Sequence, residues 1–160
     1  MRLRFSCVLP MVVFSALTLI AKQPVCEVSA DTVAFGAYQP LTNTLRNTSS
    51  AIAVSCTGKE GDTVYYTLIL NIGSGSSYAS RQMSSGSYTL LFNLYTDAAR
   101  TQIWGDGTGG TVTISGSMVL TDSTVTRTHI VYGRIPGSQR GPGAGSYIDP
   151  AMVVRCDYSK

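Results

Sequence analysis

The sequence is poor in charged side chains and has a single histidine. Of its 160 residues only 13% are charged, with 12 Lys and Arg against 9 Asp and Glu. The basic residues are scattered along the chain, so it lacks the basic cluster that nucleic-acid binding requires. We therefore expect no nucleic-acid partner. Abundant Ser, Thr and Gly with so little charge are typical of the surfaces of extracellular β-proteins.

Catalytic and metal-binding motifs are also scarce. A Ser-His-Asp site would have to use His129, but this residue lies in a Thr-rich run that predicts a strand, and no Gly-x-Ser-x-Gly elbow occurs. No Cys-x-x-Cys or His-x-x-x-His pair is present to bind zinc. Gly105, Gly107 and Gly110 match a dinucleotide-binding pattern, but strand-forming residues follow where that motif needs a helix, so a glycine hairpin is predicted. We expect no catalytic, cofactor or metal site.

Residues 1–21 have the features of a secretory signal peptide. Arg2 and Arg4 precede an uncharged run over residues 5–21, which is shorter than the roughly 20 apolar residues of a spanning helix. Cleavage after Ala21 is expected, cleavage after Ser15 is the second option, and an uncleaved membrane anchor is the alternative. No later stretch is long and apolar enough to cross a bilayer, so residues 22–160 are predicted to be one secreted domain without a membrane span.

Cysteine usage indicates a disulfide in an oxidising compartment. Cys7 lies in the predicted signal peptide, and Cys26, Cys56 and Cys156 remain. Cys26–Cys56 is the favoured pair and would close a loop of about 30 residues, stabilising the fold by roughly 3–4 kcal/mol. Cys156 is then expected to be a buried free thiol in the last strand. A bond to another chain, or an exchange with one of the other two cysteines, is left open.

Hydrophobic residues alternate with period two through most of the chain, which predicts strands. No segment shows the helical i, i+3, i+4 pattern. About seven or eight short strands at this spacing predict an all-β, immunoglobulin-like sandwich of two sheets. The predicted strands cover residues 26–30, 52–56, 64–70, 90–94, 112–114, 118–120, 130–132 and 152–158.

Turn-forming residues separate these runs. Residues 59–62 are short enough to join neighbouring strands, residues 121–123 give a hairpin signal, and Gly116 is expected to interrupt a strand. Residues 73–80 and 136–145 are predicted to be flexible Gly-rich loops.

Seven short motifs then occur in a fixed order. They are Cys26–Tyr38 with its Phe35-Gly-Ala-Tyr38, Val54–Thr57, Ser80–Met83, Leu91–Asp97, Trp104–Gly107, Tyr132–Pro136 and Gly145–Asp149. With these motifs the chain resembles the spore coat protein U family, whose domain is also the subunit of archaic chaperone–usher pili.

The resemblance implies an incomplete immunoglobulin-like fold that lacks one strand and accepts it from a partner. In such pilin-like subunits a periplasmic chaperone fills the hydrophobic groove, and the N-terminal extension of the next subunit replaces it at an outer-membrane usher. The resemblance also implies a bond between Cys26 and Cys56. It implies transit through the periplasm to a surface fibre, or fimbria, or to a coat, and a role in adhesion and biofilm formation.

The predicted cleavage point decides whether this subunit can also donate a strand. A donor needs about 10 residues at roughly 3.3 Å each, and residues 22–25 are too few. Cleavage after Ala21 therefore predicts a subunit that only accepts a strand, as at a tip. Cleavage after Ser15 would leave Ala16–Ala21, with Leu17 and Leu19 on one face, as part of a donor.

Two other function classes are weighed against a structural subunit. One is a self-complete sandwich that binds a sugar or a host surface through residues 73–80 and 136–145. The other is a secreted hydrolase that would use His129, Asp106 and Asp149. The motifs favour the structural subunit, and the chain is not expected to be an enzyme.

Overall fold

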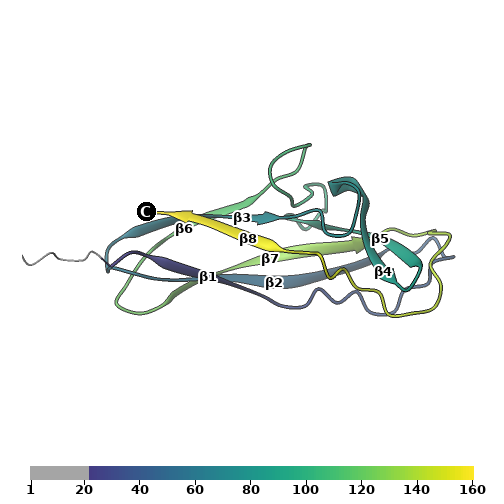
Figure 1. The fold of residues 1–160 in the computed structure, drawn as a ribbon, viewed down its shortest axis with the longest axis horizontal. Coiled ribbons are helices and arrows are strands. Elements are labelled where there is room, and N and C mark those ends of the chain that lie inside the picture. The colour runs from purple at the N-terminus through teal and green to yellow at the C-terminus, as the bar shows by residue number, and fades with distance from the viewer. Residues whose placement is uncertain (1–21) are drawn as a thin grey trace, which may run out of the picture.

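Residues 22–160 form two β-sheets in the computed structural model, with one short 3-10 turn, η1 (Tyr78–Ser80) (Figure 1). The predicted signal peptide, both predicted cleavage positions and Cys7 lie outside these described residues. The strands are β1 (Val25–Ala30), β2 (Arg46–Thr57), β3 (Thr63–Leu70), β4 (Arg81–Ser85), β5 (Tyr88–Tyr95), β6 (Ile114–Val119), β7 (Val125–Ile135) and β8 (Val154–Ser159).

The order of the strands in the two sheets identifies the type of β-sandwich. One sheet has the order β1-β2-β7-β5-β4, the other has the order β6-β3-β8, and neighbouring strands are antiparallel. Strands β1, β2, β7 and β5 occupy the places of A, B, E and D in the immunoglobulin fold, and β3 and β8 occupy those of C and F. A complete fold has a further strand beside F, whereas no strand of residues 22–160 pairs with the outer edge of β8. The predicted two-sheet immunoglobulin-like fold is confirmed, and it has the incomplete, pilin-like form.

The core lies between the sheets and follows the predicted alternation. In β3 every second residue is buried, and β2 and β5 bury their own alternate residues against it. Burying each such side chain contributes about 1.5–3 kcal/mol. The buried hydrophobic residues are Ile52, Val54, Cys56, Val64, Tyr66, Leu68, Leu70, Met83, Leu90, Phe92, Leu94, Trp104, Ile114, Met118, Leu120, Val131 and Ile135.

Several turn predictions were wrong because a turn signal does not say which sheet receives the next strand. Residues 121–123 do not close a hairpin: they carry the chain from β6 in one sheet to β7 in the other. Residues 59–62 likewise connect strands of different sheets. The glycine run after Trp104 is not a hairpin either, since Trp104 and Val112 form a parallel bridge. The hairpin that does form, β4–β5, turns at Gly86 with φ of 58° and was not predicted.

Gly116 does not interrupt a strand, because β6 runs through it. A Cβ at this position would overlap the ring of Tyr66, which lies opposite Gly116 in the β3–β6 ladder. The Tyr66 hydroxyl then reaches across the core to Nε2 of His129 at 2.9 Å, and the two rings meet edge to face. The glycine therefore leaves room for a tyrosine that connects the sheets.

We predict that Gly116→Ala lowers the free energy of unfolding by about 1–3 kcal/mol, the usual cost of overpacking. Ser117→Ala, on the exposed outer face of the same strand, should change it by less than about 0.5 kcal/mol. Denaturant melts of both variants measure the difference, and equal stabilities would contradict the packing argument.

The structure contains a disulfide between Cys26 and Cys56, the pair favoured by the sequence. These residues lie directly opposite each other on β1 and β2, with an S–S distance of 2.06 Å and a sequence separation of 30. Cys156 on β8 is free and half-buried. Burial raises the pKa of its thiol above the usual value, which lowers its reactivity at neutral pH.

We predict that the double variant Cys26→Ser/Cys56→Ser loses roughly 3–4 kcal/mol of stability, since the unfolded chain regains the entropy of the closed loop. Cys156→Ser is the matched control and should retain most of its stability. The readout is the midpoint of thermal unfolding without reductant, and equal melting of the two variants would refute the assignment.

Candidate functional site: an apolar groove

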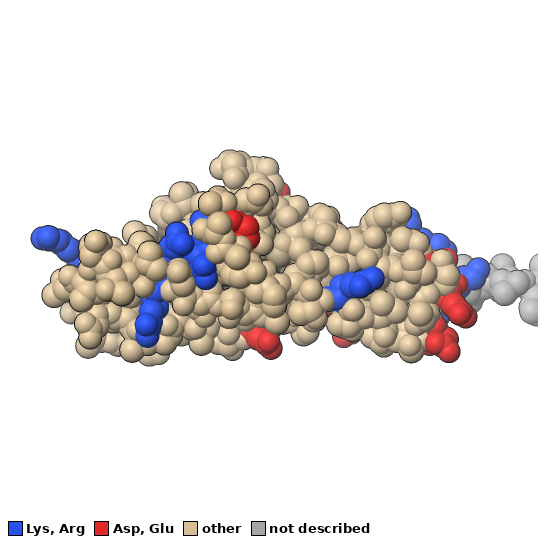
Figure 2. All heavy atoms as spheres, turned by 180° about the vertical axis from the view of Figure 1, so that it is seen from behind, with Lys and Arg blue, Asp and Glu red and all other residues tan. Residues whose placement is uncertain are grey.

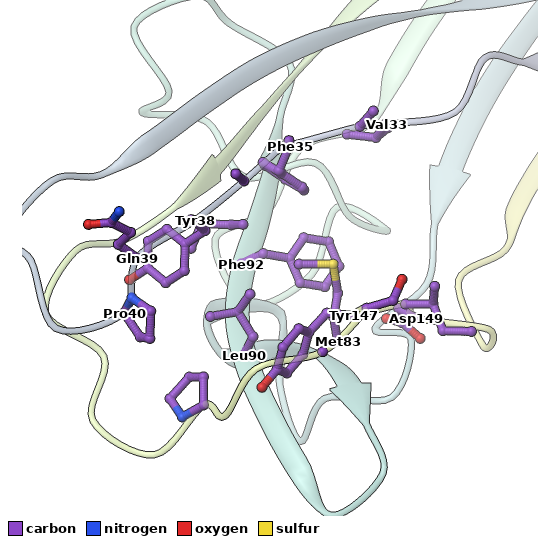
Figure 3. Close-up of a pocket in the computed structure, with 18 of the residues that line it drawn as sticks. Val33, Phe35, Tyr38, Gln39, Pro40, Met83, Leu90, Phe92, Tyr147 and Asp149 are labelled. Carbon is purple, nitrogen blue, oxygen red and sulfur yellow. The ribbon is translucent and has the colours of Figure 1, made fainter.

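The sandwich has a gap between the segment that follows β1 and the segment that leads into β8. A cavity of about 1270 Å³ separates residues 32–42 from residues 142–149, and a second cavity of about 190 Å³ adjoins it. Both cavities are lined by Val33, Leu94 and Met152. We call this continuous space the groove, residues 31–42 its first lip and residues 142–153 its second lip (Figure 3).

The floor of the groove is part of the hydrophobic core, and its side chains line the cavity while remaining mostly buried. It is formed by Met83, Leu90, Phe92, Leu94 and Ile135. Figure 3 shows Tyr38 and Tyr147 beside this floor. Their hydroxyls donate to backbone carbonyls, to that of Pro136 at 2.6 Å and to that of Gly143 at 2.8 Å. Since these polar atoms are already satisfied, the groove favours an apolar occupant.

The first lip runs beside β2 without forming a regular ladder. The N–H of Asp31 donates to the carbonyl of Ala51 at 3.0 Å, and beyond it side chains replace backbone partners. The hydroxyl of Ser50 donates to the Asp31 carbonyl at 3.0 Å, and that of Thr48 to the Ala34 carbonyl at 2.8 Å. Within the described chain, no backbone N–H of residues 32–38 donates a hydrogen bond. These groups remain available to another strand.

An aromatic contact anchors the first lip to the floor. Phe35 packs edge to face on Phe92 with ring centroids 6.0 Å apart. It lies over Gly133, where a Cβ would come within 2.8 Å of the Phe35 ring and of the Thr48 methyl group. Gly36 follows with φ of 71°, a conformation that favours glycine. Two motifs far apart in sequence, around Phe35 and around Gly133, thus form a single contact.

Polar side chains hold the second lip. The Asn71 amide donates to the Ala151 carbonyl at 2.8 Å and accepts from the Val153 N–H at 2.9 Å, which extends the β3–β8 ladder by one side chain. The Asp149 carboxylate accepts from the N–H of Ser74 at 3.1 Å and from its hydroxyl at 2.8 Å. Residues 73–80, predicted to be a flexible loop, therefore support the second lip.

A fully buried arginine lies beneath this support. Arg81 donates to the side-chain oxygen of Asn93 at 2.8 Å and to the carbonyls of Asn71 at 2.9 Å and Trp104 at 2.7 Å. Its guanidinium also lies 5.1 Å from the ring centre of Tyr78. Burial lowers the pKa of Arg81 to about 10, so the group keeps its charge at neutral pH. Its bond to Asn71 connects the core to the residue that holds the second lip.

The open edge of β8 exposes side chains that face the core. Cys156 lies opposite Leu68, and Val154 lies opposite Leu70, in the β3–β8 ladder. The two leucines are buried, whereas Cys156 and Val154 are only half-buried, because no neighbouring strand covers them. An unpaired edge beside exposed apolar side chains is the arrangement to which an additional strand binds.

The residues considered for catalysis have separate structural partners. His129 bonds Tyr66, and burial lowers its pKa. Asp106 accepts from the Thr108 hydroxyl and N–H, which lower the pKa of its carboxyl group. Asp149 holds Ser74.

Residues 22–160 contain no group of three His, Cys, Asp or Glu side chains arranged to bind a metal. Nor does any helix in this range have the length and apolarity to cross a bilayer. On the face drawn in Figure 2, Lys and Arg side chains stand apart from one another and form no continuous basic surface.

Sequence reasoning did not single out three residues that shape the groove. Arg81 lay within a recognised motif, but its burial depends on partners from three other segments. Asn71 and Gln139 each replace a backbone partner, and only the strand register reveals this. Pro136 was the one available signal, since a proline at the end of a strand leaves a ladder position without a donor.

Comparison with known proteins agrees with this geometry. The Spore Coat Protein U domain model matches residues 12–154, and the chain belongs to this family. A chain in the crystal structure of a CsuC–CsuE chaperone–tip adhesion subunit pre-assembly complex, from archaic chaperone–usher Csu pili of Acinetobacter baumannii, has a similar fold with a TM-score of 0.54 and 18% identity. The match covers 86% of this chain but only 40% of that chain. No curated protein sequence matches.

We predict that Gly133→Ala displaces Phe35 and loosens the first lip, at a cost of about 1 kcal/mol in unfolding free energy. Chymotrypsin should then cleave after Phe35 or Tyr38 severalfold faster than in the unaltered chain. Thr128→Ala, at an exposed position of the same strand, is the control and should leave the cleavage rate unchanged. Equal rates in the two variants would contradict the anchoring role of Gly133.

Proposed function

We propose that this protein is a structural subunit of a surface fibre or coat, and that a β-strand from another polypeptide completes its fold. The observation that carries the proposal is the groove, which joins the unpaired edge of β8 to a large cavity lined by apolar core residues. Neither feature has a use in a self-complete sandwich, and each is an aggregation hazard unless it is covered.

An added strand fits both features at once. Its backbone would pair with the outer edge of β8 and with the free N–H groups of the first lip. Its alternate side chains would point onto Phe92 and Leu94 in the floor. Each aliphatic or aromatic side chain buried in this way contributes about 1.5–3 kcal/mol. Affinity then comes from the backbone ladder, and specificity comes from the groove.

A periplasmic chaperone and an outer-membrane usher are the proposed assembly partners. Support comes from membership of the spore coat protein U family and from the similar fold of a chain in a chaperone–tip subunit complex. The proposed route is secretion with residues 1–21 removed as a signal peptide, transit through the periplasm, and exposure at the cell surface. Since β1 starts at Val25, cleavage after Ala21 would leave a subunit that accepts a strand without donating one.

A strand-addition experiment tests the proposal. The secreted chain is mixed with a ten-residue peptide that alternates Leu or Val with Thr, and with a scrambled peptide of the same composition. The alternating peptide should bind with one-to-one stoichiometry and raise the midpoint of thermal unfolding by on the order of 5 °C or more, because it binds only the folded state. The scrambled peptide should not. A stable monomer indifferent to both peptides would refute strand acceptance.

A further inference from the structure

One edge of β5 loses its strand partner at the mouth of the groove. Strand β7 pairs with β5 only from Asn93 to Tyr95, with Asn93 opposite Arg134. If the same register continued for two more residues, Leu91 would face Pro136. Proline has no N–H, so the ladder cannot continue there. Leu91 needs another partner on this side, because β4 occupies the other edge of β5.

The side-chain amide of Gln139 supplies that partner. The N–H of Leu91 donates to Gln139 Oε1 at 2.8 Å, and Gln139 Nε2 donates to the carbonyl of Leu91 at 2.9 Å. The same Nε2 lies 3.2 Å from the carbonyl of Pro136. The amide therefore acts as an inserted peptide group between β5 and the end of β7.

The residues around this amide also hold the first lip. The carbonyl of Pro136 accepts the Tyr38 hydroxyl at 2.6 Å as well as the Gln139 amide. The N–H of Ser138 donates to the carbonyl of Thr42 at 2.8 Å, although Ser138 has a φ of 58° that is unfavourable for a side-chain-bearing residue. Contacts on both sides maintain this strained backbone.

Residues 136–139 therefore bond both to β5, at Leu91, and to the first lip, and the second lip begins three residues further on, at residue 142. We name the bonded set of Tyr38, Leu91, Pro136 and Gln139 the clasp. Of these residues Tyr38 lines the larger cavity, and so do Leu90 and Ile135, the chain neighbours of Leu91 and Pro136.

We propose that the clasp is a positioning device that keeps the mouth of the groove at the spacing that an incoming strand requires. This inference rests on the proposed function, since it assigns a role to residues around the same groove. In the empty protein the apolar cavity and the exposed Leu41 and Ile148 on the lips favour collapse of the lips, because collapse would remove apolar surface from water. The clasp opposes that collapse by tying the first lip, through Tyr38, to β5 and to the end of β7. Without it, an occupant would have to reopen the mouth, and binding would weaken.

Two small substitutions test the clasp. Gln139→Glu keeps the shape and the oxygen that accepts from the Leu91 N–H but replaces the donating Nε2 with a second acceptor, and Tyr38→Phe removes only the hydroxyl bond to Pro136. The controls are Gln102→Glu, in an exposed loop, and Tyr65→Phe, on the outer face of β3. The dissociation constant for the fluorescently labelled alternating Leu/Thr peptide is measured by anisotropy. Thermal unfolding of the empty chain is measured in parallel.

We expect each clasp variant to weaken peptide binding about fivefold, the scale of one net hydrogen bond, while both controls bind as the unaltered chain does. The double variant should lose less than the product of the two single effects, because both bonds converge on Pro136. The midpoint of unfolding of the empty chain should fall by only a few degrees.

The outcomes separate this inference from the proposed function. If the unaltered chain binds no alternating peptide, strand acceptance fails and the clasp inference fails with it. If the unaltered chain binds and the clasp variants bind equally well, with or without a lower unfolding midpoint, the residues are merely structural and only this inference is overturned. If Gln139→Glu does not fold, Tyr38→Phe alone decides, since it deletes a single half-buried hydroxyl.

Discussion

The unpaired outer edge of β8 is the constraint on which the rest of the structure depends. A sandwich normally covers its core by pairing every inner strand on both sides, and here the strand that bears Val154 and Cys156 is paired on one side only. The lost partner would have contributed ladder hydrogen bonds and a row of inward side chains. Its absence from residues 22–160 leaves an apolar cavity above the buried side chains of Phe92 and Leu94, and the surrounding chain is arranged around that cavity.

Where the regular sheets end beside the groove, side chains form several of the hydrogen bonds that the backbone of a further strand would otherwise form. The hydroxyls of Thr48 and Ser50 hold the first lip, the amide of Asn71 extends the ladder below the second, and the amide of Gln139 replaces a peptide group beside Leu91. Such substitutes satisfy local backbone groups without adding a strand. The first lip is thereby held in place while the N–H groups of residues 32–38 stay unpaired, which a regular strand in that position would not permit.

Much of this arrangement follows from local sequence signals, and the remainder depends on register. Alternating residues from Val64 to Leu70 predicted which side chains face the core, because the period of a strand is fixed by its backbone. The same reasoning gave a wrong prediction for Gly116. A glycine within an alternating pattern indicates a break in the strand unless the facing Tyr66 is known. Residues 121–123 show that a turn signal contains no information about sheet membership.

From the sequence, the groove could be predicted only through the family resemblance. That resemblance implied an open edge, and the fold agrees with it. The roles of Arg81 and Gln139 could not be predicted, because each depends on partners brought together by folding. For Gln139 the partner is Leu91, 48 positions away.

The half-burial of Cys156 determines when its thiol can react. The half-buried thiol lies on the strand whose outer edge is unpaired, so reagents in solution have partial access to it. On the proposed function, insertion of a neighbouring strand would turn β8 from a border strand into an interior one and would seal that sulfur from solvent. The cysteine would then be chemically vulnerable only in transit, and a finished assembly would protect it.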